Sequence, residues 1–135
     1  ANIFSKQFLS KKFTQKITSI WMNTNSYKDS NRVHNHPGSA ISGVYYVKAP
    51  SSAGNIVFQH PSMNELGFYY NSFQSLPGDV NEPEEYNQYN TSLVKAPAIE
   101  NTLYLFPSWL MHYVESNMNK TEERISISFN ISPSK

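Results

Sequence analysis

The chain has 135 residues, of which 39% are hydrophobic and 16% charged, and it contains eight Phe and nine Tyr but no Cys. This length predicts a single domain, 1–135, because a second hydrophobic core would leave both units too small to be stable. The formal net charge of +1 provides no field that would draw the chain to nucleic acid or to an anionic membrane. Without cysteine, any metal must be bound by His and carboxylates.

The sequence shows no signal for a membrane or for secretion. No apolar run approaches the ~20 residues of a membrane-spanning helix. The first twenty residues contain four Lys but no compact apolar stretch. The three glycosylation sequons, at Asn90, Asn119 and Asn130, are therefore interpreted as chance matches. We expect a cytoplasmic protein.

Segments rich in β-branched and aromatic residues, with a period of two, predict strands along most of the chain. In chain order these segments are residues 17–25, 40–49, 55–59, 102–106, 111–115 and 123–131. Only the first fifteen residues could hold a helix, and weakly. Many short strands separated by turn residues predict an all-β fold with little helix, an antiparallel sandwich or jelly roll.

Residues 71–90 are rich in Pro, Gly, Asn and Glu and have no apolar period, which predicts a long loop. Long loops in small domains commonly cover functional sites or are disordered. We therefore expect this segment to be the lid of a site.

Two histidines, His34 and His36, are two residues apart, so on an extended segment both side chains project from the same face. Neutral imidazole is the commonest transition-metal ligand. His112, on a distant predicted strand, could complete a facial set that leaves other coordination positions open. The alternative is that His34 and His36 are surface residues of a polar turn.

The last predicted strand alternates strictly between an apolar and a polar face. Its apolar residues are Ile125, Ile127, Phe129 and Ile131, and its polar residues are Arg124, Ser126, Ser128 and Asn130. A fixed guanidinium can bind a carboxylate through two parallel hydrogen bonds, to which a neighbouring hydroxyl adds a third. The alternative is a solvent-facing edge strand with Arg124 paired to Glu122 or Glu123.

Other polar and aromatic residues are candidates for a cavity. Trp21, Asn23 and Asn25 share one face of the first strand, which either lines a pocket for a cosubstrate or substrate or is exposed. His60 is either a substrate contact or, as the chain around it favours, a turn residue before Pro61. We expect Trp109 to pack in the core, and the same holds for Tyr69 and Tyr70.

Taken in order, these motifs resemble the Fe(II)/2-oxoglutarate-dependent oxygenase superfamily. The resemblance is to a little-characterised group of 2OG-Fe(II) oxygenases found among marine bacteria and their phages, distantly similar to prolyl 4-hydroxylases. It covers residues 17–131. The segments that carry it are WMNTN (21–25), HNHPGS (34–39), SGVYYV (42–47), FPSWL (106–110), His112 and RISISFN (124–130).

The resemblance implies a double-stranded β-helix (jelly-roll) fold, similar to that of cupins. It places Fe(II) on His34, His36 and His112. The distal carboxylate of the cosubstrate 2-oxoglutarate would then lie on Arg124 and Ser126. Two further residues are assigned to cosubstrate binding: Tyr46, which matches a carboxylate-binding tyrosine of prolyl-hydroxylase-like members, and Asn23. Asn25, His60 and Trp21 are candidates for contact with the substrate or support of the site.

The activity so implied is hydroxylation of an unidentified substrate, such as a protein or amino-acid side chain, with O2 and 2-oxoglutarate. No nucleic-acid or membrane partner is expected; a homodimer is left open, and a phage-encoded member would act in the host cytoplasm. His36 departs from the family pattern, which has Asp or Glu at this position. Two alternatives therefore stand: a cupin-type three-His metalloenzyme without 2-oxoglutarate, and a non-catalytic jelly-roll binding domain.

Overall fold

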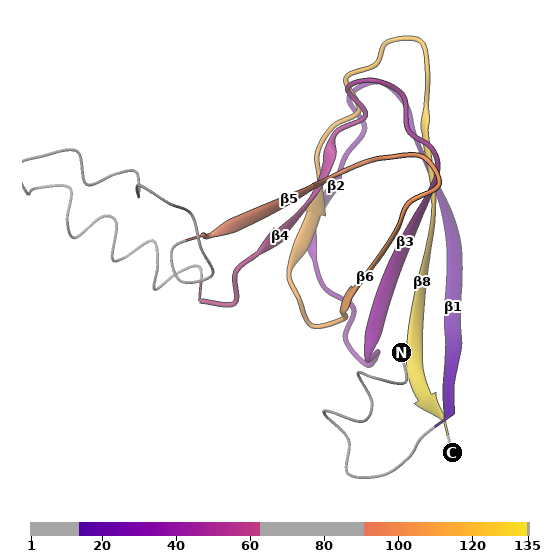
Figure 1. Ribbon diagram of the computed structural model, residues 1–135, viewed down its shortest axis with the longest axis vertical. Coiled ribbons are helices and arrows are strands. Elements are labelled where there is room, and N and C mark those ends of the chain that lie inside the picture. The colour runs from indigo at the N-terminus through magenta and orange to yellow at the C-terminus, as the bar shows by residue number, and fades with distance from the viewer. Residues whose placement is uncertain (1–13, 63–90, 135) are drawn as a thin grey trace, which may run out of the picture.

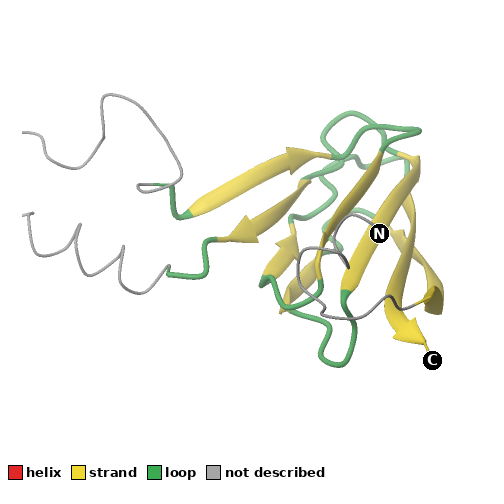
Figure 2. Cartoon of the chain, turned by 60° about the horizontal axis from the view of Figure 1, so that its bottom comes forward, coloured by secondary structure: helices red, strands yellow, loops and turns green. Residues whose placement is uncertain are grey.

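The computed structural model describes residues 14–62 and 91–134, which form two four-stranded antiparallel sheets packed face to face (Figures 1 and 2). The described ranges contain no helix, and so none that could cross a membrane. The predicted lid, 71–90, and Tyr69 and Tyr70 lie outside the described residues. So does most of the weakly predicted N-terminal helix, except that Thr14 and Gln15 belong to a strand.

The strand order is that of a jelly roll, as predicted. The first sheet has the order β1 (Thr14–Asn25), β8 (Arg124–Ser134), β3 (Ile41–Lys48) and β6 (Leu103–Pro107). The second has the order β2 (Asn31–His34), β7 (His112–Val114), β4 (Asn55–Gln59) and β5 (Leu93–Pro97). Strands that follow one another in the chain mostly belong to opposite sheets, so the chain passes repeatedly from one sheet to the other.

All six predicted strands are present, and β4 has the predicted bounds. Two strands were missed. β2 is short and mostly polar, while β5 contains one Lys and ends in Pro, so neither shows an apolar period of two. Both lie in the second sheet, where β2 pairs with β7 and β5 with β4.

The apolar core between the sheets is small. It is built on Val44 and Tyr46 of β3, Ile56 of β4 and Phe106 of β6. The ring of Phe58 meets Phe106 edge to face, with centroids 5.0 Å apart. Trp109 is not part of this core, contrary to the prediction, because 58% of its surface is exposed beyond the end of β6.

β8 is a central strand, paired with β1 on one side and β3 on the other. Its polar face points inward: Arg124 and Ser126 are buried. The alternating apolar residues therefore face outward, where Ile127 pairs with Met22, a residue 68% exposed. The solvent-facing interpretation of Arg124 is thus wrong, since β8 and its neighbour β1 turn their polar faces to the interior.

Two glycines with positive φ allow a direct test of the loop that supports Arg124. Gly54 has φ +81°, and an added Cβ would lie 2.7 Å from the carbonyl oxygens of Glu115 and Ser116. Gly38 has φ +84°, with nothing within 4 Å of its Cβ position. We expect Gly38→Ala to cost about 1 kcal/mol and Gly54→Ala about 3 kcal/mol or more. Urea unfolding checks this, and equal costs would contradict the role given to the close approach.

Candidate metal centre

The three histidines singled out in the sequence come together between the sheets. His34 ends β2 and His112 begins β7, and the two are register partners. His36 lies in the loop after β2. Their ring centroids are 4.4 to 5.2 Å apart. One ring nitrogen of each lies within 4.8 Å of the others, which is the spacing of a three-ligand metal site.

Two of the rings are held in the tautomer that a metal needs. The Nδ1 atom of His34 is 2.6 Å from the carbonyl oxygen of Arg32, and that of His112 is 2.8 Å from the carbonyl oxygen of Leu110. A carbonyl oxygen only accepts, so Nδ1 must carry the proton in both rings. Nε2 is then left with a free lone pair, as in many proteins where a backbone carbonyl orients a metal-binding His.

Burial favours the neutral form of two of the imidazoles, those of His112 and His36. Desolvation lowers the pKa of His112 to about 4; its bond to Leu110 raises the pKa, and nearby His34 and His36 lower it further. The pKa of His36 is lowered by burial and then by His34. Within the described residues, no carboxylate belongs to the group, so the candidate ligand set consists of imidazoles alone.

Arg124 forms the other end of the site, with only 1% of its surface exposed. Its Nη1 donates to the carbonyl oxygens of Ala53 and, over 3.0 Å, Glu115. The Nη2 atom of Arg124 and the Oη atom of Tyr46 are buried and have no partner among the described residues. Burial raises the pKa of Tyr46 to about 12 although Arg124 lowers it, so the phenol is a neutral donor. Two unpaired buried donors, one of them cationic, fit a carboxylate.

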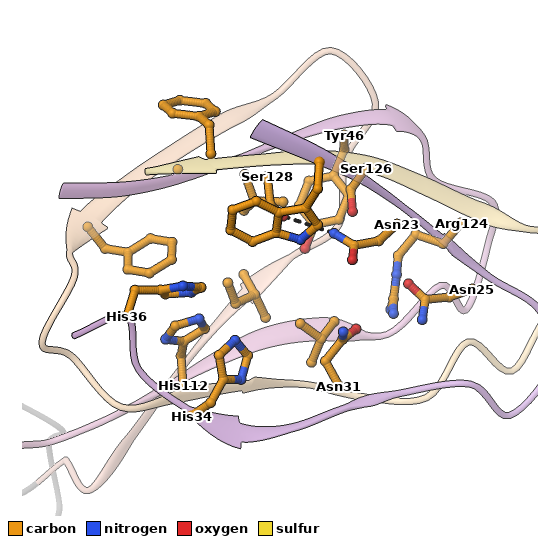
Figure 3. A pocket seen from close by; sticks show the side chains of 17 residues that line it. Asn23, Asn25, Asn31, His34, His36, Tyr46, His112, Arg124, Ser126 and Ser128 are labelled. Atoms are coloured by element: carbon orange, nitrogen blue, oxygen red, sulfur yellow. Dashed lines mark hydrogen bonds between the residues drawn. The ribbon is translucent and has the colours of Figure 1, made fainter. Parts of the chain in front are cut away.

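A single cavity joins the two ends (Figure 3). The imidazoles gather at one end, and Arg124 lies at the other beside Asn25. The apolar side chains that line the space between them are Val44, Ile56, Phe106 and Val114. The cavity is therefore suited to an elongated ligand that offers metal-binding atoms at one end and a carboxylate at the other.

The cavity also receives the polar face of β1. Trp21, Asn23 and Asn25 all line it, together with Ser126. The Nδ2 of Asn23 donates to Ser128 Oγ over 3.0 Å, and the Trp21 ring lies 5.7 Å from that of His36. The exposed-face interpretation of this strand is therefore wrong for these three residues.

His60 has the turn position that the chain around it favoured, and one residue that lines the cavity was missed. His60 is not among the described residues that line the cavity; its Nδ1 accepts a hydrogen bond from the Ser62 backbone N–H, as a turn residue does. Asn31, at the start of β2, does line the cavity but was missed. A two-residue alternation would place Asn31, three residues before His34, on the opposite face of the strand. The pairing register of β2 shifts between these two residues, and no signal in the sequence indicated that shift.

Comparison with known proteins gives one family. A family model described as "Putative 2OG-Fe(II) oxygenase" matches residues 19–130. No curated protein matches the chain.

Several solved structures share the fold. An oxidoreductase of the 2OG-Fe(II) oxygenase family from Burkholderia pseudomallei is 16% identical, with a TM-score of 0.60 over 96% of this chain and 50% of that one. The α-ketoglutarate-dependent epimerase SnoN from nogalamycin biosynthesis is 15% identical, with a TM-score of 0.57 over 87% and 47%. A Pseudomonas putida prolyl-4-hydroxylase is 13% identical, with a TM-score of 0.51 over 85% and 52%. The present chain thus spans about half the length of these proteins.

The buried His112 makes the metal-free protein sensitive to acid. The unfolded chain binds a proton at this residue near pH 6.5, whereas the folded chain does so only near pH 4. Stability is therefore complete above pH 6.5 and falls as the pH drops toward 4, by about 3 kcal/mol from this residue. Urea unfolding with a chelator present, repeated across this range, measures the slope. His112→Gln should flatten it, and an unchanged slope would contradict this assignment.

Proposed function

The chain belongs to the 2OG-Fe(II) oxygenase family, and from this we propose that it is a dioxygenase that uses Fe(II) and 2-oxoglutarate to hydroxylate a substrate. In this proposal His34, His36 and His112 bind the metal. Arg124, Tyr46 and Ser126 bind the distal carboxylate of 2-oxoglutarate, and Asn23 lines the same pocket.

One observation carries the proposal: a three-histidine group and a buried guanidinium, whose Nη2 has no partner among the described residues, line the same cavity. Neither feature is specific alone, since three histidines also suit metals that need no cosubstrate. Together they match a molecule that has a 2-oxo acid at one end and a carboxylate at the other. The orphaned Nη2 of Arg124 and Oη of Tyr46 are donors that such a carboxylate would satisfy.

The bound iron and cosubstrate would supply the oxidative chemistry, in which O2 is divided between succinate, formed with release of CO2, and a hydroxyl group on the substrate. The chain's own residues would orient the metal and the cosubstrate and enclose them. His34 and His112 present lone pairs fixed by their Nδ1 bonds. Arg124 holds the cosubstrate in one direction, and the apolar walls exclude water from the space between.

The substrate class is proposed at the level of the family only. Similar folds act on unlike molecules, as the names of the epimerase and the prolyl-4-hydroxylase show, so fold does not select among them. We propose a protein or amino-acid side chain. Mass spectrometry of peptide pools incubated with the iron-loaded protein, 2-oxoglutarate and O2 would show a gain of one oxygen atom.

A cupin-type metalloenzyme that does not use 2-oxoglutarate is the second candidate, favoured by the absence of a carboxylate from the ligand group. Arg124 separates the two. In the first candidate Arg124 binds the cosubstrate, whereas in the second it is a structural residue and its loss leaves ligand binding at the metal intact.

Anaerobic titration with Fe(II) and then 2-oxoglutarate tests the proposal directly. We expect the wild type to bind Fe(II) and then to develop the weak visible charge-transfer band of the chelate. Arg124→Met should retain Fe(II) but bind 2-oxoglutarate at least about 100-fold more weakly, because a desolvated charge pair is lost. Arg32→Met removes the same charge from an exposed position and should change neither affinity. If the iron-loaded wild type does not develop the charge-transfer band with 2-oxoglutarate, the proposal is wrong.

Tyr46→Phe gives a second test, in which stability and 2-oxoglutarate affinity should respond differently. The variant removes a buried hydroxyl that has no partner, so metal-free stability should stay equal or rise. Affinity for 2-oxoglutarate should fall about tenfold, since one hydrogen bond to a charged group is lost. Tyr104→Phe is the control: its hydroxyl donates to the Pro97 carbonyl, so it should lose stability and keep 2-oxoglutarate affinity. Unchanged affinity in Tyr46→Phe would remove Tyr46 from the site.

A further inference from the structure

The three metal-binding candidates are not held equally firmly. His34 and His112 are paired residues of neighbouring strands, and a backbone carbonyl fixes each ring. His36 lies in the loop between β2 and β3, and among the described contacts its ring has no hydrogen bond. Its ring only stacks near His112 and Trp21. The position of His36 must therefore be set through its backbone.

Ser108 supplies that support. Its carbonyl oxygen accepts a hydrogen bond from His36 N–H over 2.9 Å, and its own N–H donates to the Ala40 carbonyl over 3.2 Å. The two bonds attach both ends of the loop, residues 36 and 40, to one residue. Ser108 is fully buried just after β6. Any shift of Ser108 would thus move the loop that carries His36.

Ser108 is in turn fixed by a chain of polar side chains that crosses the first sheet. Ser42 Oγ donates to Asn130 Oδ1 over 2.7 Å, so its single proton is used. The 2.8 Å contact between Ser108 Oγ and Ser42 Oγ then requires Ser108 to be the donor. Asn130 Nδ2 donates to Ser19 Oγ over 3.1 Å. These hydrogen bonds link the turn after β6 to β3, β8 and β1, and so reach all four strands of the sheet or their ends.

Ser42 and Ser108 are buried, and a buried hydroxyl without a partner is costly, so their hydrogen bonds are satisfied only when both side chains occupy one position. Ser19, at the far end of the chain, is exposed. Apolar side chains could fill the same space but would allow small shifts. Ser42, Ser108 and Asn130 also belong to the sequence motifs SGVYYV, FPSWL and RISISFN, and neither the metal site nor the carboxylate site uses them. Their common role must lie elsewhere.

We propose that the hydrogen-bonded chain Ser108–Ser42–Asn130–Ser19 is a positioning element that holds His36 as the third metal ligand. This inference rests on the proposed function, because it assumes that the three histidines bind a metal. It assigns to the chain a contribution to metal affinity. None of its members touches the metal or the cosubstrate.

The test compares metal affinities of purified variants by anaerobic calorimetry with Co(II), in the absence of 2-oxoglutarate. Ser42→Ala and Ser108→Ala should bind Co(II) 10- to 100-fold more weakly than the wild type, the usual effect of losing support of a ligand. Their visible Co(II) spectra should approach that of His36→Ala. In the His36→Ala background, Ser42→Ala should have no further effect on affinity, because the ligand it positions is gone.

Asn117→Ala is the matched control for loss of a buried polar residue. Asn117 is also fully buried, and its Nδ2 donates to the carbonyl oxygens of Asn25 and Glu122, at the Arg124 end. It should lower stability without changing Co(II) affinity. Failure of the wild type to bind Co(II) would overturn the metal site itself. A wild type that binds Co(II), with Ser42→Ala binding equally well or losing affinity also in the His36→Ala background, would overturn only the positioning role.

Discussion

Burial of the Arg124 guanidinium is a constraint that shapes everything around it. Removing such a charge from water costs several kcal/mol unless partners replace the hydration. The loops after β3 and β7 supply those partners for Nη1, through the carbonyl oxygens of Ala53 and Glu115. Their approach is close enough that only glycine fits at position 54. Nη2 remains unpaired and faces the cavity, so the fold leaves part of the cost to be offset by an anion.

The electrostatics of the opposite end complement this arrangement. A divalent metal on three neutral imidazoles keeps both of its charges, since the ligand group includes no carboxylate. With Arg124, the cavity would then hold three positive charges between apolar walls, where interactions are poorly screened. A dianionic ligand that reaches both ends lowers this excess, whereas a neutral ligand leaves it. A ligand set without a carboxylate would bind the metal alone less strongly. It would also make the binding of the metal and the binding of the anion mutually dependent.

Much of the site could be predicted because the spacing of neighbouring residues indicated which side chains share a face. The two-residue spacing of His34 and His36 and the alternation of β8 are visible in any extended segment, and the order of the motifs indicated which distant residues join them. What could not be predicted depends on sheet register. Ser19, Ser42, Ser108 and Asn130 are far apart in sequence and meet only because β1, β8, β3 and β6 are neighbours. Asn31 was missed because the register of β2 shifts between it and His34, which a period of two does not predict.

The alternation of β8 also shows what a period of two leaves open. It separates the residues into two faces but does not say which face is inside, and the usual rule would bury the isoleucines. At β8 and β1 this rule is inverted, although β3 and β6 of the same sheet bury apolar residues. Arg124 and Ser126 are buried, while Met22 and Ile20 of β1 are exposed on the other side. A sheet that buries its polar face gives up apolar burial and must satisfy those polar groups in another way. Asn23 donates to Ser128, but one donor each of Arg124 and Tyr46 has no partner within residues 14–62 and 91–134. The failure of the hydrophobic-inside rule at this strand is therefore itself a sign of a ligand site, and it falls where the sequence pattern alone favoured ordinary surface.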